Sequence, residues 1–581
     1  MLLLVQTALY VWMAPRGFEF TDESFYLLNY LYWRDLTATV SFFGAYFEAP
    51  FRLLGQSVFA IRIFSLVALV VSSGFFARES LRFSRKREGN DASPLMPFVV
   101  VGMAASSFYF GYFSSLRAPS YNLLALCAML IASGLLLRLT MRRGSPTQFR
   151  MTALCYGVTL GACGLDKAST GALMFVLHAM FFAIANRDWR VRRLLELSSL
   201  ILAGVALNVG LLQLAHPNWS SALREGVAMT NIIGHGGLFE LARAMVLEFL
   251  SLAPALLELS VVAAAVIVLA RNIRHNRRTQ ISIAAVALIC CCALEMARSQ
   301  DRRLWLPTVA LSVLVLWSFE MPWRNPRQWT RDDAIDIGFT CVLLALPLAF
   351  SFGTNIPVLQ HSQMAAVFGT LALLIRLQRL ADQREVTKLG LAVSLTLLAV
   401  PTFVIQLQNT FDAQHAYRLR TALVDQTLPA RVGPANTRLR LDSTTRDAII
   451  AINAAGRAAG FTPRQQVLDL TGDGPGLIYA LGGRPLGVAW LSGGYSGSEI
   501  AATRLIARLP QRALQRAWLL TSSTNPRRIV GWQHMLDERL GAGAHEWVAT
   551  VRMRSPSGWQ LNGPALTDVD IWRPRVAASR P

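Results

Sequence analysis

Charged residues are scarce in this chain, and acidic residues are the scarcest of them. Only 16% of the 581 residues are charged, with 35 Asp and Glu against 56 Lys and Arg, which gives a net charge of +21. Hydrophobic residues make up 53%, and the mean hydropathy is +0.39. This balance excludes an ordinary soluble domain and predicts an integral membrane protein.

Other absences narrow the class further. No cysteine follows Cys341, so the C-terminal part cannot be a disulfide scaffold. The first apolar run, residues 2–14, lacks the basic start and small-residue cleavage site of a signal peptide, and it is expected to stay as a span. No Gly-x-Gly-x-x-Gly follows a strand in the membrane half, so no nucleotide-binding fold is expected there.

The basic residues lie in short clusters between apolar runs. This pattern is typical of the cytoplasmic loops of a multi-pass protein, and it also favours anionic lipid headgroups. We therefore expect membrane lipids as partners and no nucleic acid. The clusters run from Arg78 to Arg87, Arg138 to Arg150, Arg187 to Arg193, Arg271 to Arg278, Arg324 to Arg331 and Arg376 to Lys388.

Apolar runs predict a polytopic transmembrane helical bundle, mainly α, of about 13 helices. The basic clusters alternate with less basic loops, and this alternation requires an odd number of spans. As one helix, residues 151–185 would be about 50 Å long against ~30 Å of hydrocarbon, so two helices that turn at Asp166-Lys167 are expected. The runs lie near 2–14, 57–77, 95–113, 121–139, 151–164, 170–186, 195–215, 251–270, 280–297, 304–319, 334–352, 363–380 and 388–407.

The chain changes character near residue 408. Residues 1–407 form the predicted transmembrane domain, whereas residues 408–581 are polar and rich in Arg, Gly and Pro. Val467 to Leu470 reads as a strand before a Gly-rich turn and an apolar helix, and Leu486 to Leu491 reads as a further strand. The succession of strand, turn, helix and strand predicts a small α/β domain. The alternation of the basic clusters places this domain on the outer side of the membrane, together with the loops 15–56, 114–121, 165–170, 216–250, 298–303 and 353–362.

An acidic pair, Asp22-Glu23, stands just after the first apolar run, in Thr21-Asp22-Glu23-Ser24-Phe25-Tyr26. If residues 2–14 cross the membrane, the pair emerges on the far side at the boundary between lipid and water. A carboxylate there can act as a general base or bind a cation for a substrate whose tail stays in lipid. Asp22 is therefore the leading candidate for a functional residue.

Aromatic residues crowd the loop 15–56 and predict two helices that lie flat at the membrane interface. They either anchor the loop or border a cavity that opens sideways to lipid. Arg62, at the start of the second span, lies within reach of that face. Arg117 and Tyr121 belong to the next predicted outer loop.

These residues together resemble the C-type (GT-C) membrane glycosyltransferase superfamily. The Asp22-Glu23 context, the aromatic helices and the segment Gly55 to Arg62 are similar to the branch that contains the lipid A aminoarabinose transferase and the protein O-mannosyltransferases. Gly161 to Ala172, with Lys167 in its turn, resembles that branch's glycine-rich segment, and Arg302 to Pro307 is a fainter match. The resemblance covers roughly residues 1–320. Where many relatives carry Lys-Pro-Pro, this chain has Tyr46 to Phe51.

The resemblance implies an inverting transferase. Such enzymes move a sugar from a polyprenyl-phosphate donor to a lipid, glycan or protein acceptor at the outer face. It implies a multi-pass protein of the bacterial inner (plasma) membrane, with its active site and C-terminal domain facing the periplasm. No cofactor is certain, although a divalent cation is compatible with the chemistry.

The resemblance also implies roles for particular residues. Asp22 would be the general base, and Glu23 would assist it or bind the cation. Lys167 either serves the donor phosphate or simply pairs with Asp166. The donor phosphate would be held by Lys167, Arg117, Arg302, Arg303 and Arg62, and the substrates by Tyr26, Tyr121 and Asp166.

Two other functions remain open at this point. A transporter or flippase of a lipid-linked sugar would suit a polytopic body, but it predicts paired halves with broken helices, and the sequence shows no such internal symmetry. A non-catalytic envelope assembly protein would give no reason for the placement of Asp22-Glu23 and Lys167. The Gly-rich stretches 471–476 and 492–498 could cradle a phosphate, but turn chemistry is the favoured interpretation.

Overall fold

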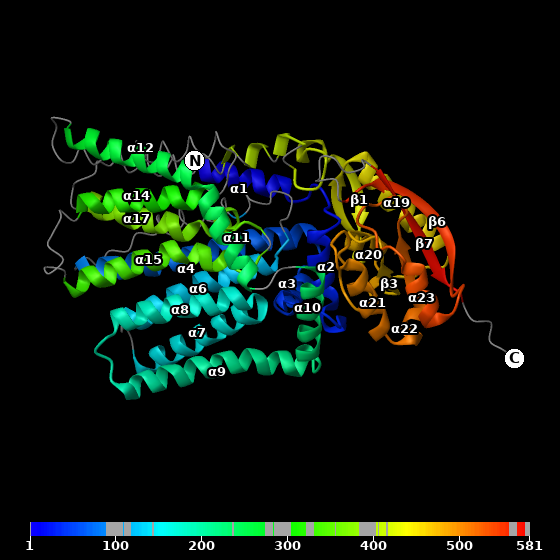
Figure 1. The fold of residues 1–581 in the computed structure, drawn as a ribbon, viewed down its shortest axis with the longest axis horizontal. Coiled ribbons are helices and arrows are strands. Elements are labelled where there is room, and N and C mark those ends of the chain that lie inside the picture. The colour runs from blue at the N-terminus through cyan, green and yellow to red at the C-terminus, as the bar shows by residue number, and fades with distance from the viewer. Residues whose placement is uncertain are drawn as a thin grey trace.

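The structure of this chain is a computed structural model. It describes residues 2–88, 109, 118–141, 145–234, 238–272, 283, 304–320, 330–354, 356–382, 403–404, 406–408, 410–413, 416–556 and 566–575. In Figure 1 the long helices lie side by side, and the α/β unit covers one end of them. The helices of the membrane part are α1 (Leu2–Met13), α2 (Asp22–Tyr32), α3 (Phe43–Leu53), α4 (Val58–Glu88), α6 (Tyr121–Met141), α7 (Pro146–Asp166), α8 (Ala168–Ala185), α9 (Val191–Ala215), α10 (Trp219–Ile233), α11 (Leu238–Ser251), α12 (Ala253–Asn272), α14 (Trp305–Glu320), α15 (Arg331–Ser351), α16 (Val358–Ser362) and α17 (Val367–Asp382).

The predicted mainly helical bundle is confirmed. Five described helices are long and apolar enough to cross a membrane, and two bent pairs, with breaks of 53° and 62°, raise the number to seven. The predicted runs near 95–113, 280–297 and 388–407 lie almost entirely outside the described residues. The count of about 13 helices therefore stays a prediction.

The predicted break in residues 151–185 is confirmed. α7 ends at Asp166 and α8 begins at Ala168, because Lys167 between them leaves the helical conformation with φ −140° and ψ 85°. The two helices turn back on each other at this point (Figure 1). The turn places a carboxylate and an ammonium at the end of the bundle that carries the first loop.

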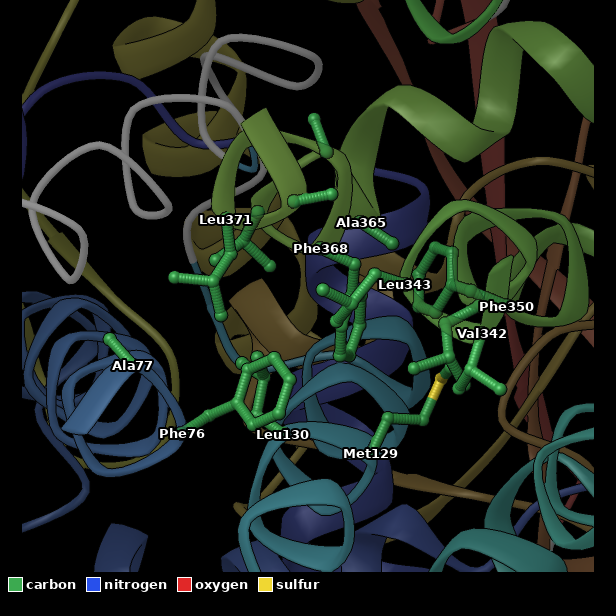
Figure 2. Close-up of a cluster of buried hydrophobic side chains, with 14 of the residues drawn as sticks. Phe76, Ala77, Met129, Leu130, Val342, Leu343, Phe350, Ala365, Phe368 and Leu371 are labelled. Atoms are coloured by element: carbon green, nitrogen blue, oxygen red, sulfur yellow. The ribbon is translucent and has the colours of Figure 1, made fainter. Parts of the chain in front are cut away.

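The bundle packs around a large apolar core. Figure 2 shows Phe76 of α4 and Leu130 of α6 facing Phe368 of α17, with Leu343 and Phe350 of α15 nearby. The ring centroids of Phe76 and Phe368 lie 5.2 Å apart, and all five side chains are at most 1% exposed. Close packing of this kind fixes α15 and α17 against α4 and α6, and Phe350 of α15 also accepts a hydrogen bond from Lys167 through its carbonyl.

Two short helices, α2 and α3, fill the first loop, whereas their flat orientation at the membrane interface stays a prediction. Their aromatic side chains turn mostly inward: Tyr30, Phe43 and Phe51 are completely buried, and the rings of Tyr30 and Phe51 lie 5.3 Å apart. Trp33 Nε1 donates to the Glu48 carboxylate at 2.7 Å. These aromatic residues therefore build a rigid support beneath α2, so their main contacts are with protein.

The C-terminal unit holds a mixed five-stranded sheet in the order β4-β3-β5-β7-β6. β4, β3 and β5 are parallel, and β7 and β6 continue the sheet antiparallel. Helices cover this sheet, and a separate hairpin, β1-β2, precedes it (Figure 1). The elements are β1 (Leu428–Val432), β2 (Thr437–Leu441), α19 (Ser443–Ala458), β3 (Gln466–Asp469), α20 (Pro475–Leu481), β4 (Arg484–Pro485), α21 (Ser498–Arg508), α22 (Gln511–Arg516), β5 (Trp518–Thr521), α23 (Trp532–Leu540), β6 (His545–Arg554) and β7 (Leu566–Pro574).

The strand predicted at Leu486 to Leu491 is wrong. The extended segment there, β4, contains only Arg484 and Pro485. Leu486 N still donates to Val467 O at 3.0 Å, but Gly487 then takes a φ of +82° and turns the chain away from the sheet. A positive φ breaks the extended conformation that further pairing with β3 requires.

The C-terminal unit is docked tightly onto the loop that precedes α2. Gly17 N donates to Arg440 O at 2.9 Å, Arg440 N donates to Pro15 O at 2.8 Å, and Gly476 N donates to Phe20 O at 2.7 Å. One hydrophobic cluster contains side chains from both parts, among them Phe18 and Tyr479, whose rings stack 5.8 Å apart. The backbone around the acidic pair is thus held from both sides.

Candidate active site

Three carboxylates gather at the start of α2. Asp22 is the first residue of the helix and Glu23 the second, and Glu19 lies in the preceding loop. A helix N-terminus favours negative charge, which suits this placement. Glu19 and Glu23 are 2% and 0% exposed, whereas the side chain of Asp22 is 22% exposed. Asp22 is therefore the carboxylate of this group that a substrate can reach.

Two consecutive residues from the segment before β1 hold Asp22. Arg418 Nη1 lies 2.8 Å from Asp22 Oδ2, and Tyr417 OH donates to the same oxygen at 2.9 Å. Arg418 also donates to the Thr21 hydroxyl. Burial would lower the pKa of Arg418, but the neighbouring Asp22 carboxylate raises it above its ordinary value, so the guanidinium stays charged. The segment before β1 thus places a positively charged guanidinium beside Asp22.

Glu19 caps α2, and no sequence motif singles it out. Its carboxylate accepts from Thr21 N at 2.8 Å and Glu23 N at 2.9 Å, and from the Thr21 hydroxyl. These bonds occupy backbone donors that the first turn of a helix leaves unpaired. Burial raises the pKa of Glu19 to about 7, against the lowering effects of Arg418 and these hydrogen bonds.

This raised pKa predicts a pH effect on stability. The unfolded pKa of a Glu is about 4.3, so between that pH and about 7 the folded protein binds the proton more tightly than the unfolded chain. The stability contributed by protonated Glu19 is therefore fully present below the unfolded pKa and is lost as pH rises through 7. Thermal unfolding at pH 5 and at pH 7.5 measures this effect. We expect the Tm of the wild type to fall more between these two pH values than the Tm of Glu19→Gln. Equal losses would contradict this expectation.

Glu23 and Arg62 form a fully buried pair beneath the site. Arg62 Nε and Nη2 donate to the two Glu23 oxygens at 2.7 and 2.6 Å, and the two side chains are 1% and 0% exposed. Arg62 also donates to the carbonyls of Ala14 at 2.6 Å and Gly17 at 2.9 Å. Both Glu23 oxygens are thus occupied, and a divalent cation at Glu23 does not fit this arrangement.

Lys167 and Asp166 lie together at the α7–α8 turn, both under 9% exposed. Lys167 Nζ donates to Phe350 O at 2.5 Å and Asn122 Oδ1 at 3.4 Å, and Ser41 Oγ donates to Asp166 Oδ1 at 2.6 Å. Burial lowers the pKa of Lys167 to about 7, and Asp166 opposes this. An anion beside Lys167 would therefore raise the pKa of its ammonium group and keep that group charged.

Aromatic rings join the Asp22 region to Lys167. The rings of Tyr26 and Tyr121 lie 6.1 Å apart, and each packs against Phe43. Tyr121 begins α6, and the next residue, Asn122, is the one that Lys167 contacts. The structure thus brings five predicted site residues to one end of the bundle: Asp22, Tyr26, Tyr121, Asp166 and Lys167.

Three of the arginines predicted to hold the donor phosphate belong to segments that are not described. These are Arg117, Arg302 and Arg303, which lie outside the described residues. Within the described part of the chain, no group of three or more His, Cys, Asp or Glu side chains is arranged to hold a metal ion.

The Gly-rich stretch 471–476 serves the domain contact. Gly476 N donates to Phe20 O, so the start of α20 is occupied by the loop before α2. A Cβ at Gly476 would lie 2.6 Å from Phe20 Cα, which shows how closely the two backbones approach. This geometry agrees with turn chemistry as the favoured interpretation of the stretch.

No protein-family model matches the chain, and no curated protein matches its sequence. Among solved structures, the chain is similar to ArnT from Cupriavidus metallidurans in the apo state, with 15% identity, a TM-score of 0.44 and coverage of 98% of this chain and 97% of that one. The same protein bound to undecaprenyl phosphate has 13% identity and a TM-score of 0.42, with coverage of 99% of this chain and 98% of that one. The Archaeoglobus fulgidus oligosaccharyltransferase in complex with Zn and sulfate has 10% identity and a TM-score of 0.34, with coverage of 90% of this chain and 68% of that one.

The sequence identity of the chain to these neighbours is 10–15%. Their TM-scores lie below 0.5, so no residue roles are carried over from them. The roles proposed below rest on the contacts of this chain.

Proposed function

We propose that this protein is an inverting membrane glycosyltransferase, which moves a sugar from a polyprenyl-phosphate carrier to a lipid, glycan or protein acceptor. The proposal places the site at the outer face of the bacterial inner membrane, beneath residues 408–581 as a periplasmic domain. Support for this orientation comes from the basic clusters, because Arg138 and Arg193 lie at the end of the bundle opposite Asp22.

The observation that carries the proposal is the asymmetry of the Asp22 carboxylate. Both of its contacts with the C-terminal segment are made by Oδ2, and Oδ1 accepts no hydrogen bond from the described residues. Glu19 and Glu23, in contrast, are buried, and both oxygens of each carboxylate accept hydrogen bonds from protein groups. A partly exposed carboxylate with one oxygen occupied and the other open has the geometry that a general base needs.

The chemistry follows from these positions. Asp22 Oδ1 would accept the proton of the acceptor's nucleophile while that atom bonds to the anomeric carbon. The bond from this carbon to the phosphate oxygen breaks, its electron pair leaves with the polyprenyl phosphate, and the configuration inverts. Arg418 and Lys167 would stabilise the negative charge on the leaving phosphate, which is a purely electrostatic contribution.

Other residues would shape the site. We propose that Tyr26 and Tyr121 border the sugar and that Asp166 holds the α7–α8 turn through Ser41. Arg117, Arg302 and Arg303 remain proposed phosphate ligands. Glu23 and Arg62 are proposed as positioning residues, in place of direct roles, because the oxygens of Glu23 and the guanidinium of Arg62 are already used by protein groups.

A comparison of cells tests the function directly. Envelope glycolipids and glycans would be compared by mass spectrometry in cells lacking the protein and in cells complemented with the wild type. We expect one sugar unit to be lost in the null and to return on complementation, with consumption of a polyprenyl-phosphate sugar by the purified protein. A lost sugar without donor consumption by the purified protein would favour the transporter or the assembly protein.

Arg418 offers a separate prediction. Arg418→Gln should lower kcat roughly 10²–10³-fold, because it removes a charged donor from the place where phosphate charge develops. Arg418→Lys should recover part of that loss, since it keeps the charge. The measurement is the rate of sugar transfer by the purified protein.

Arg484→Gln is the matched control for Arg418. It breaks another arginine–aspartate pair across the same domain contact, in which Arg484 Nη2 lies 2.7 Å from Asp35 Oδ1. Equal losses in the two glutamine variants would mean that domain docking explains the effect. Arg418 would then have no role of its own in transfer.

A further inference from the structure

A cavity lies at the end of the bundle opposite Asp22. It has a volume of about 350 Å³ and opens between the end of α6 and the starts of α7 and α9. α7 has 21 residues, and its other end, Asp166, contacts the first loop, so about 30 Å separates the cavity from the candidate active site. The cavity therefore does not belong to that site.

Positive charge dominates the cavity lining. Arg138, Arg150 and Arg193 line it against one acid, Glu196. Arg150 Nε is paired with Glu196 at 2.8 Å, and Arg138 Nη2 with Glu79 at 2.8 Å. Arg193 is exposed and makes no hydrogen bond or ion pair to the described residues through its side chain. The cavity thus offers an uncommitted guanidinium, with two more guanidinium groups in reach.

The remaining lining and its border suit a lipid. Phe149 and Trp189 line the cavity beside the arginines, and their rings lie 5.8 Å apart. Just outside, on the membrane-facing helices, Met151, Leu194 and Leu195 are 54%, 39% and 63% exposed. A tryptophan next to arginines at the ends of apolar helices is typical of the headgroup level of a bilayer, and the exposed apolar side chains leave a path for acyl chains.

We propose that this cavity binds the headgroup of an anionic phospholipid. The phosphate would sit between Arg193 and Arg150, with the acyl chains along α7 and α9. The start of α7, where Ser145 caps the helix, adds a partial positive charge on the same side. Basic pockets between transmembrane helices recognise anionic headgroups in this way. The site is independent of the proposed transferase activity.

Native mass spectrometry of the purified full-length protein in detergent tests this site. Phosphatidylglycerol and phosphatidylcholine with identical acyl chains would be added as probes. We expect phosphatidylglycerol to be retained in preference, and Arg193→Gln to bind it about five-fold more weakly, which corresponds to one basic contact near a membrane surface. Equal retention of the two lipids by the wild type would overturn the proposal.

Two further variants sharpen the test. Arg192→Gln removes the same charge one residue away, but Arg192 does not line the cavity, so its binding should be unchanged. Glu196→Gln should strengthen phosphatidylglycerol binding, because it releases Arg150. Equal weakening in the Arg192 and Arg193 variants would indicate diffuse surface charge and overturn the site. Displacement of the lipid by equimolar glycerol phosphate would identify a free-anion site and overturn the lipid assignment.

Discussion

Asp22→Asn should lower kcat for sugar transfer by about 10²–10⁴-fold, which is the usual contribution of a positioned general base. Asparagine keeps the size of the side chain and can still accept from Tyr417 and Arg418 through its amide oxygen. It cannot take a proton at the position of Oδ1. The loss should therefore appear in kcat with little change in protein yield or Tm. The rate of donor consumption by purified protein measures it.

Asp35→Asn is the matched control for this variant. Asp35 belongs to the same loop and also pairs with an arginine of the C-terminal unit, Arg484, but it lies away from α2's N-terminus. It should retain near wild-type transfer. If Asp22→Asn also restores every glycan to null cells, Asp22 is not the base, and the transporter or assembly interpretation takes precedence.

Much of this arrangement could be predicted because it depends on short stretches of sequence. Asp22 and Lys167 stood out as charges beside apolar runs, where an ionised side chain is costly unless it has a partner or a function. The break at Asp166-Lys167 followed from helix length against bilayer thickness. Such inferences need only local periodicity and the physics of the membrane.

The missed parts have different causes, and one of them is contact between distant segments. Tyr417 is 395 residues from Asp22, and nothing in the local sequence around it indicates where the segment before β1 will dock. Glu19 was overlooked because its role is to cap α2 by hydrogen bonds to Thr21 N and Glu23 N, and Glu at this position fits no common capping pattern. The false strand at Leu486 failed because a single positive φ, at Gly487, redirects the chain.

The second large effect concerns Arg62, for which sequence and structure imply different roles. Arg62→Ala should destabilise the protein by about 3–5 kcal/mol, because it leaves the Glu23 carboxylate buried without its partner. It also strips the Ala14 and Gly17 carbonyls of their donors, and these carbonyls fix the loop that leads to Asp22. Unfolding of the purified protein by denaturant measures this cost.

A double variant separates the two roles of Arg62. Replacing both partners, Glu23→Leu with Arg62→Met, removes the buried charges together and should recover most of the stability that Arg62→Ala loses, as apolar replacement of buried pairs commonly does. If Arg62 acts only by positioning, the recovered protein should bind polyprenyl phosphate with near wild-type affinity. A stable double variant that no longer binds the phosphate would instead make Arg62 a direct ligand, as the sequence had suggested. The two sites of positive charge near Asp22 would then be Arg62 and Arg418, one from each half of the chain.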